Sequence, residues 1–257
     1  MGKVSTCPIE HGSKLSGNLP KSSWMKNMIG KPGKLEMRKK MEYSKLNLSS
    51  DVDNWKETML VYSSALKEIG TKLEILNDEF QHVHRYNPIE HIKSRIKTPE
   101  SIVKKLKKNG YESTIENMVM YVNDIAGIRI ICSFTTDIYR IAEMLANQSD
   151  VKVLSVKDYI KNPKPSGYKS YHMIVAIPIY LSDRIIEAKV EIQIRTVAMD
   201  FWASLEHKIN YKFEGNAPEH IKDELYACAV MVSDLDAQML ALNEEIQAIE
   251  KENQQNK

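Results

Sequence analysis

Two long stretches of the chain repeat apolar residues at alternating spacings of three and four, the period of an amphipathic α-helix. The first covers 52–80 and the second covers 221–249. Three shorter helical patterns occupy 98–108, 137–147 and 198–212. The pattern therefore predicts a long helix near each end of the chain, with shorter helices between them.

Strand patterns lie between the helices, in segments that alternate or concentrate apolar residues. They cover 127–134, 151–156, 172–179 and 188–195. The second and third are joined by 161–167, Lys-Asn-Pro-Lys-Pro-Ser-Gly, which is typical of a loop. Strands that alternate with helices predict an α/β core.

The pattern also divides the chain into parts. Residues 1–50 have no sustained period and predict a flexible N-terminal extension. We expect the folded domain, including its N-terminal helix, to span 51–215, followed by a C-terminal helix over 216–257. The last two heptads of that helix favour pairing with another subunit over simple packing on the sheet, so we expect a homo-oligomer.

Composition narrows the function classes. A formal charge of +2 over 257 residues gives no global sign of nucleic-acid or membrane binding. The three cysteines are widely spaced and form neither a disulfide framework nor a C-x-x-C site, which suits a reducing cytosol. No apolar run approaches the roughly 20 residues that span a bilayer. We therefore expect a cytoplasmic protein with no membrane partner.

Residues 190–196 read Val-Glu-Ile-Gln-Ile-Arg-Thr, and their alternation puts Glu191, Gln193 and Arg195 on one side of a strand. An acid, an amide and a guanidinium then stand in a row, about 7 Å apart at each step. Such a row suits the floor of a binding site. An exposed sheet face with cross-strand charge pairs is the alternative, and for Arg195 we expect a structural ion pair.

A cluster of positive charge precedes and enters the helix at 98–108. Thr98 is suited to cap that helix. Arg95 and Lys97 lie just before the cap, and Ser101 and Lys105 lie just inside it. Side-chain charge and the backbone N–H groups of the helix start would converge there, which favours a polyphosphate ligand.

Two carboxylates are candidates for a metal site. Asp124 lies just before the strand at 127–134, and Glu191 lies on the polar side of another apolar strand. Adjacent strands would bring the two acids together, and Mg²⁺ is typically held by one or two carboxylates plus substrate phosphates. For Asp124 on its own, a cap or an Asx-turn is the alternative.

The loop before the third strand combines basic and aromatic residues. Lys157, Lys164 and Lys169 lie in or beside it, together with Tyr168 and His172. A Gly-Tyr pair on a loop can present its ring to a base, with Lys and His near phosphate. A surface turn anchored by its aromatic residues, with a structural histidine, is the alternative.

Four segments, in this order, resemble the synthetase domain of the Rel/Spo-type (p)ppGpp synthetases. They read Ser-Arg-Ile-Lys-Thr-Pro-Glu-Ser, Asp-Ile-Ala-Gly-Ile-Arg, Ser-Gly-Tyr-Lys-Ser-Tyr-His and Val-Glu-Ile-Gln-Ile-Arg-Thr. The resemblance covers about 52–230 and is strongest to the RelQ-type small alarmone synthetases of Gram-positive bacteria. It implies a nucleotidyltransferase-like α/β (α+β) domain, with a mixed sheet of about five strands flanked by helices.

The resemblance also implies a reaction, the transfer of the β,γ-pyrophosphate of ATP to the 3′-hydroxyl of GTP or GDP. The products would be AMP and pppGpp or ppGpp, with Mg²⁺ as the cofactor. The chain contains no His-Asp dipeptide, so we expect synthesis without a hydrolase domain. The resemblance further implies a tetramer, with single-stranded RNA and (p)ppGpp as candidate regulators.

Site residues follow from the resemblance position by position. Asp124 would hold Mg²⁺, and Glu191 would share the metal and take the proton of the 3′-hydroxyl. The ATP side would comprise Arg95 on the adenine and, around the phosphates, Lys97, Ser101, Lys105 and Arg129. The GTP side would comprise Tyr168 on the guanine, with Lys157, Lys164, His172 and Gln193. Ser155-Val-Lys-Asp158 keeps only half of the Arg-x-Lys-Asp found in long family members, which leaves the guanine-nucleotide preference open.

Two other functions remain open at this point. One is a degenerate synthetase fold that binds guanine nucleotides or single-stranded RNA without turnover. The other is a different nucleotidyltransferase that uses the same two carboxylates. Asp124 and Glu191 argue against the first, since pure anion binding gains nothing from two acids.

Overall fold

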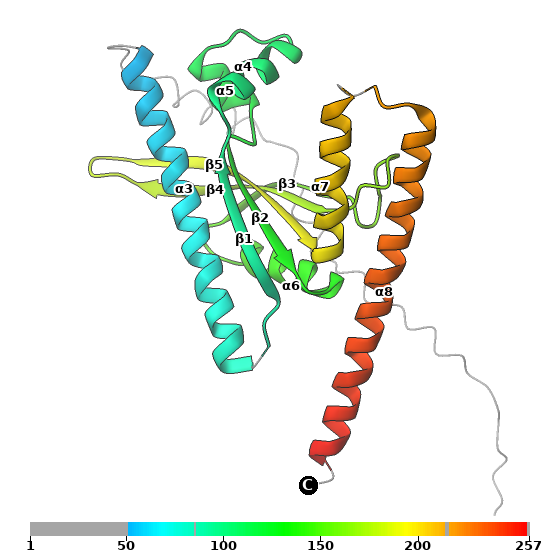
Figure 1. The fold of residues 1–257 in the computed structure, drawn as a ribbon. Helices are drawn as coiled ribbons and strands as arrows, with labels where there is room; N and C mark the ends of the chain where they lie inside the picture. Colours follow the sequence, from blue (N-terminus) through cyan, green and yellow to red (C-terminus); the bar gives the residue numbers. More distant parts are fainter. Residues whose placement is uncertain (1–50, 85, 214–215, 256–257) are drawn as a thin grey trace, which may run out of the picture.

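The computed structural model describes residues 51–84, 86–213 and 216–255, so the extension expected over 1–50 lies outside the described residues. The helices, shown in Figure 1, are α3 (Asp51–Glu79), the π-helical turn η2 (Phe80–His84), α4 (Pro99–Lys108), α5 (Ile115–Tyr121), α6 (Thr135–Ala146), α7 (Val197–Lys212) and α8 (Glu219–Gln255). The strands are β1 (Ile89–Ile96), β2 (Ala126–Cys132), β3 (Lys152–Asp158), β4 (Tyr171–Tyr180) and β5 (Ile185–Thr196).

All five strands form one mixed sheet in the order β1-β2-β5-β4-β3. The central pair, β2 and β5, is parallel, and the other three pairs are antiparallel. The expected mixed sheet of five strands is therefore confirmed, with a long helix at each end of the described chain. The parallel pair matters for function because it brings two strands distant in sequence into register at the centre of the sheet.

One strand and one α-helix were not predicted from the sequence. The apolar residues of β1, Ile89, Ile92 and Ile96, are spaced by three and four as in a helix, and only Ile89 is buried. That exposure is expected of an edge strand with a single neighbour. Helix α5 has only seven residues, too few for a period to show, although the Thr114 hydroxyl accepts a hydrogen bond from the backbone N–H of Asn117.

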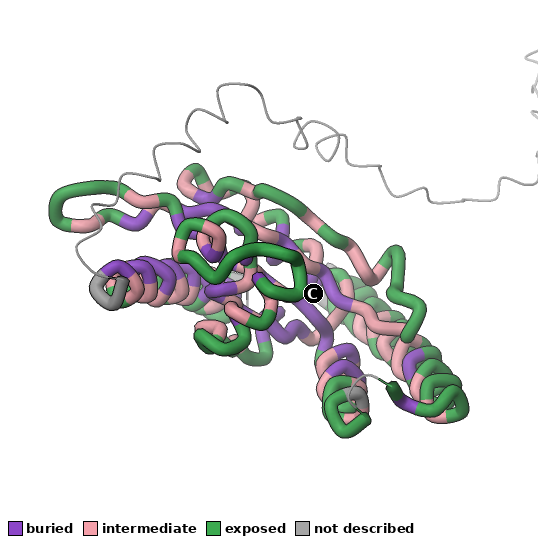
Figure 2. The backbone as a smooth tube through the Cα atoms, turned by 90° about the horizontal axis from the view of Figure 1, so that it is seen from above, coloured by how far each residue is buried: buried purple, intermediate pink, exposed green. Residues whose placement is uncertain are grey.

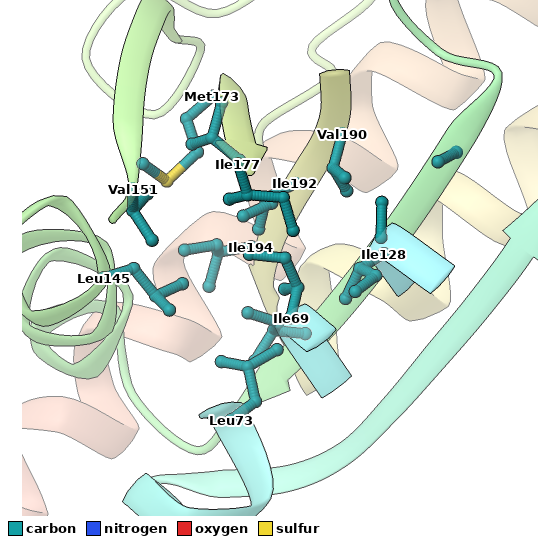
Figure 3. Packing of buried hydrophobic residues seen from close by; sticks show 14 of the residues in the cluster. Ile69, Leu73, Ile128, Leu145, Val151, Met173, Ile177, Val190, Ile192 and Ile194 are labelled. Atoms are coloured by element: carbon teal, nitrogen blue, oxygen red, sulfur yellow. The ribbon is translucent and has the colours of Figure 1, made fainter. Parts of the chain in front are cut away.

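One face of the sheet is covered by α3 and α6. Ile69 and Leu73 of α3 pack against Ile192 and Ile194 of β5, and Leu145 of α6 joins the same cluster (Figure 3). Figure 2 shows the buried residues of α3 on the side that faces the sheet. Each fully buried aliphatic side chain contributes about 1.5–3 kcal/mol of hydrophobic stabilisation. With this face sealed by side chains, ligands must use the opposite face.

Helices α7 and α8 run side by side and antiparallel beyond the end of β5 (Figure 1). Thr196 caps α7, because its hydroxyl accepts a hydrogen bond from the backbone N–H of Met199. The indole N–H of Trp202 in α7 donates to the carbonyl of Leu225 in α8 at 2.9 Å. The far end of α8 continues past the rest of the domain.

Helix α8 departs from one expectation. By length and apolar composition it is the one candidate membrane span among the described residues, although the sequence was expected to offer none. Only 6% of this apolar stretch is buried inside the domain. Its inner side nevertheless contacts the domain, since the Thr196 hydroxyl donates to the carboxylate of Asp236 at 2.6 Å.

Candidate functional site

The strand register lines up polar residues across the face opposite α3. Residues paired between neighbouring strands point to the same face of a sheet. One row crosses all five strands through Lys93, Arg129, Gln193, His172 and Lys157. The next row carries Arg95, Gly127 and Glu191. Six residues predicted for the site therefore share one surface, and they come from five strands.

Asp124 lies at the centre of a cluster at one end of this face. Lys97 donates to one of its carboxylate oxygens at 3.0 Å, and Lys105 donates to the other at 2.7 Å. Burial on its own raises the pKa of the Asp124 carboxyl, but the two lysine hydrogen bonds outweigh burial and hold that pKa below its usual value. The carboxylate is therefore charged at neutral pH.

The start of α4 lies beside this cluster as predicted. The Thr98 hydroxyl accepts a hydrogen bond from the backbone N–H of Ser101 and donates to the Ser101 hydroxyl at 3.0 Å. On the adjacent edge strand, Arg95 extends over Gly127, where an added Cβ would lie 3.8 Å from the Arg95 Cγ. Charged groups and helix N–H groups thus converge at this end of the sheet.

The loop between β3 and β4 is organised around Tyr168. Gly167 has a positive φ of 85°, a conformation that favours glycine. The Lys164 ammonium lies 4.6 Å from the centre of the Tyr168 ring and 4.9 Å from that of Tyr159, a cation–π arrangement. The Tyr168 hydroxyl is 2.8 Å from Nε2 of His172. The loop therefore holds together the basic and aromatic residues that the sequence singled out.

His172 is neutral in this environment. Burial and then the positive charge of Arg195 and other nearby cations lower the pKa of His172 to about 3. Arg195 donates to the Tyr168 hydroxyl at 2.7 Å, so this hydroxyl is free to donate its own proton to Nε2. That assignment leaves the imidazole proton on Nδ1, which lies 3.8 Å from an oxygen of Glu191.

Glu191 has a defined orientation on β5. The Gln193 amide donates to one Glu191 oxygen at 2.9 Å, while the amide oxygen of Gln193 accepts from Arg195 at 3.2 Å. Asp124 lies two residues before β2, whose Gly127 pairs with Glu191. Asp124 therefore precedes the start of β2, and Glu191 lies on the neighbouring parallel strand opposite the second residue of β2.

The sequence did not reveal the partner of Arg195. Arg195 is only 4% exposed and forms the expected ion pair, with an oxygen of Asp200 at 2.9 Å. The same Asp200 oxygen lies 3.2 Å from a nitrogen of Arg129. Asp200 stands in the first turn of α7, and an acid in the first turn of a helix was the only signal available.

Comparison with known proteins identifies the family. Residues 94–216 match the model described as a region found in RelA / SpoT proteins. The chain is 47% identical over 200 residues to the GTP pyrophosphokinase YwaC of Bacillus subtilis, which covers 78% of this chain and 95% of that protein. The chain belongs to the RelA/SpoT family. Within it, the chain is one of the GTP pyrophosphokinases of the small alarmone synthetase type, as the sequence motifs predicted.

Solved structures agree with this assignment. The crystal structure of small alarmone synthetase 2 from Bacillus subtilis is 46% identical, with a TM-score of 0.69, and the match covers 75% of this chain and 99% of that one. Small alarmone synthetase 1 from the same organism, bound to its product pppGpp, is 35% identical with a TM-score of 0.71. That match covers 76% of this synthetase and 99% of the relative.

Proposed function

We propose that this synthetase transfers the β,γ-pyrophosphate of ATP to the 3′-hydroxyl of GTP or GDP. The 3′-oxygen attacks the β-phosphorus, the bond between the α,β-bridging oxygen and that phosphorus breaks, and AMP leaves. The observation that carries this proposal is the parallel pairing of β2, which follows the cluster around Asp124, with β5, which carries Glu191. A relative in the same family binds pppGpp, the expected product.

The ATP side consists of the cluster at the start of α4. Lys97 and Lys105 transfer their hydrogen bonds from Asp124 to the phosphates, and Ser101 with the α4 N–H groups completes the cradle. Arg95 stacks on the adenine. Arg129 contributes a further donor, since its buried Nε has no hydrogen-bond partner among the residues that the structure describes.

Mg²⁺ fits the donor set of this site. Asp124 is a charged carboxylate and Glu191 lies on the neighbouring strand, and the described residues contain no group of three or more His, Cys, Asp or Glu side chains able to hold a metal. Mg²⁺ suits such a site because it takes one or two carboxylates and completes its shell with phosphates and water. Asp124 and Glu191 would hold the ion, which would supply positive charge to the phosphates.

The GTP side lies around the β3–β4 loop. Tyr168 stacks on the guanine, and Lys157 and Lys164 pair with the acceptor phosphates. His172 donates a hydrogen bond to the acceptor, and Gln193 positions its ribose. Glu191 accepts the proton of the 3′-hydroxyl as the new bond forms.

The outer surface of α8 supports a homo-oligomer, a tetramer by analogy with the family. Its exposed large apolar residues recur at helical spacing and are Tyr226, Val230, Met231, Leu235, Met239, Leu242, Ile246 and Ile249. A second copy of α8 would bury such a stripe in coiled-coil fashion. We assign the apolar composition of α8 to this pairing and place the enzyme in the cytoplasm.

The reaction is tested by incubating the protein with ATP, GTP and Mg²⁺ and separating the nucleotides by chromatography. We expect AMP and pppGpp in equal amounts. Glu191→Gln should lower kcat by about 100-fold or more, with little change in the affinity for a non-hydrolysable ATP analogue. Glu187→Gln is the matched control, because Glu187 lies on the same face of β5 four residues away and is exposed.

Other outcomes separate the alternatives. Release of pyrophosphate instead of AMP would identify a different nucleotidyltransferase. Nucleotide or RNA binding without turnover, unchanged by Glu191→Gln, would indicate a binding module.

A further inference from the structure

Arg195 uses every nitrogen of its guanidinium inside the protein. Nε donates to the Ser170 hydroxyl at 3.3 Å, and Nη1 donates to Asp200 at 2.9 Å. Nη2 donates to both the Tyr168 hydroxyl and the amide oxygen of Gln193, at 2.7 and 3.2 Å. The side chain is buried, so water does not compete for these bonds.

Two paths from Arg195 converge on Glu191. One passes through the Tyr168 hydroxyl to His172, whose Nδ1 faces Glu191 at 3.8 Å. The other passes through Gln193, whose amide donates to the second Glu191 oxygen at 2.9 Å. Hydrogen bonds make up both paths except for the 3.8 Å step from His172 to Glu191, and together the paths contain the proposed base and the proposed guanine platform.

A gain in stability alone does not account for this arrangement. A buried ion pair is often no more stabilising than apolar residues of the same volume, because desolvation of the two charges offsets their attraction. The planar fork of arginine, however, directs several hydrogen bonds at fixed angles, which a lysine ammonium cannot do. The network therefore fixes the relative orientation of the side chains that it joins.

We propose that Arg195, oriented by Asp200, is the positioning residue that fixes Glu191 relative to Tyr168. The inference rests on the proposed roles of those two residues. Asp200 extends the link to the ATP side, because the oxygen that pairs with Arg195 also lies 3.2 Å from Arg129. Arg195 therefore acts on the GTP side of the site, and Asp200 acts on both the GTP side and the ATP side.

The first test is Arg195→Lys, which keeps the charge but not the fork. At saturating ATP we expect kcat to fall by about 10- to 100-fold and the KM for GTP to rise, since misplacement of a reacting group by about 1 Å has effects of this size. The KM for ATP should stay within about twofold. Asp200→Asn should raise the KM for both nucleotides.

The stability control is Tyr86→Phe, which removes a 2.6 Å hydrogen bond to Asp137 outside the site. Thermal unfolding is measured for every variant. Tyr86→Phe should lower the Tm while leaving kcat and both KM values unchanged. If Arg195→Lys behaves like this control, or leaves kcat and the GTP KM within twofold of the parent, the proposal is overturned.

A double-mutant cycle that combines Arg195→Lys with Tyr168→Phe tests whether Arg195 acts through the Tyr168 hydroxyl. Tyr168→Phe removes the hydroxyl that joins Arg195 to His172 and keeps the stacking ring. The double variant should lose little more kcat than the more impaired single variant, whereas multiplied losses would overturn the proposal. If Arg195→Lys does not fold, the single variant Tyr168→Phe decides: an unchanged kcat and an unchanged KM for GTP in that variant would overturn the proposal. An inactive parent protein would instead refute the proposed function, and the inference with it.

Discussion

His172 is a histidine kept neutral at the centre of a cationic surface. Its ring lies edge-on to Tyr159 and to Tyr168, with centres 5.2 and 5.9 Å apart. Burial and the cations around it lower the pKa of His172 to about 3, far below the usual histidine pKa of 6.5. A neutral ring keeps one nitrogen as an acceptor for the Tyr168 hydroxyl, so the acceptor site depends on this imidazole staying unprotonated.

This neutrality predicts how stability changes with pH. Below pH 6.5 the unfolded chain protonates its histidine while the folded protein does not, so the folded state becomes less stable as the pH falls towards about 3. When the pH is lowered from 7.5 to 5, this one group should lower the free energy of unfolding of the parent protein by about 1–2 kcal/mol. His172→Gln should remove that part of the pH dependence in urea denaturation.

The matched control is His207→Gln, at an exposed position of α7. In this variant the free energy of unfolding should differ between pH 7.5 and pH 5 by as much as it does in the parent protein. An equal loss of pH dependence in both variants would contradict the assignment to His172.

At this scale, local alternation was enough to predict the polar face of β5, including Glu191 and Gln193. The same reasoning did not predict Asp200. Its contact with Arg195 crosses the junction between β5 and α7, and its contact with Arg129 joins α7 to β2, so neither follows from a sequence period. Contacts of this kind are set by tertiary packing.

Among the elements, the β3–β4 loop depends on α8. An added Cβ at Gly167 would lie 2.5 Å from the Cβ of Ala229, and Lys169 donates a hydrogen bond to the Ser233 hydroxyl. Tyr168 also packs against the small cluster formed by Trp202 and its neighbours. The sequence predicted both the loop and the helix, but their contact spans some sixty residues and is a product of the fold. Helix α8 thus packs against the β3–β4 loop, which is proposed to bind the acceptor nucleotide, and supports it.

Gly167→Ala tests this support. The new methyl group meets Ala229 and also strains a backbone with φ of 85°, so the loop must shift. We expect the KM for GTP to rise about 10-fold or more through misplacement of Tyr168, with the KM for ATP nearly unchanged. Initial rates measured against each nucleotide in turn distinguish these effects.

Gly70→Ala is the control, because an added Cβ there meets nothing within 4 Å. Inside helix α3 this change should stabilise the protein by up to about 1 kcal/mol and leave both KM values unchanged. An increase of the ATP KM in Gly167→Ala equal to that of the GTP KM would contradict a local effect on the loop.

Across the whole molecule, α8 has two different halves. The first half is tied to the domain through Trp202 with Leu225 and through Thr196 with Asp236. The second half extends past the domain, with Leu242 and Ile246 more than half exposed (Figure 1). An assembly interface must therefore be tested in the second half, because a cut near residue 230 would also remove the contacts that support the acceptor loop.

The double variant Leu242→Asp, Ile246→Asp places two charges on the exposed stripe. We expect a smaller assembly by size-exclusion chromatography with light scattering, because a coiled-coil seam does not accept unpaired carboxylates. The domain should stay folded, since neither side chain is buried. Gln247→Asp, at an exposed polar position between apolar ones, should keep the parent mass. An unchanged mass for the double variant would show that the outer half of α8 is not the interface, and would leave its apolar stripe to another partner.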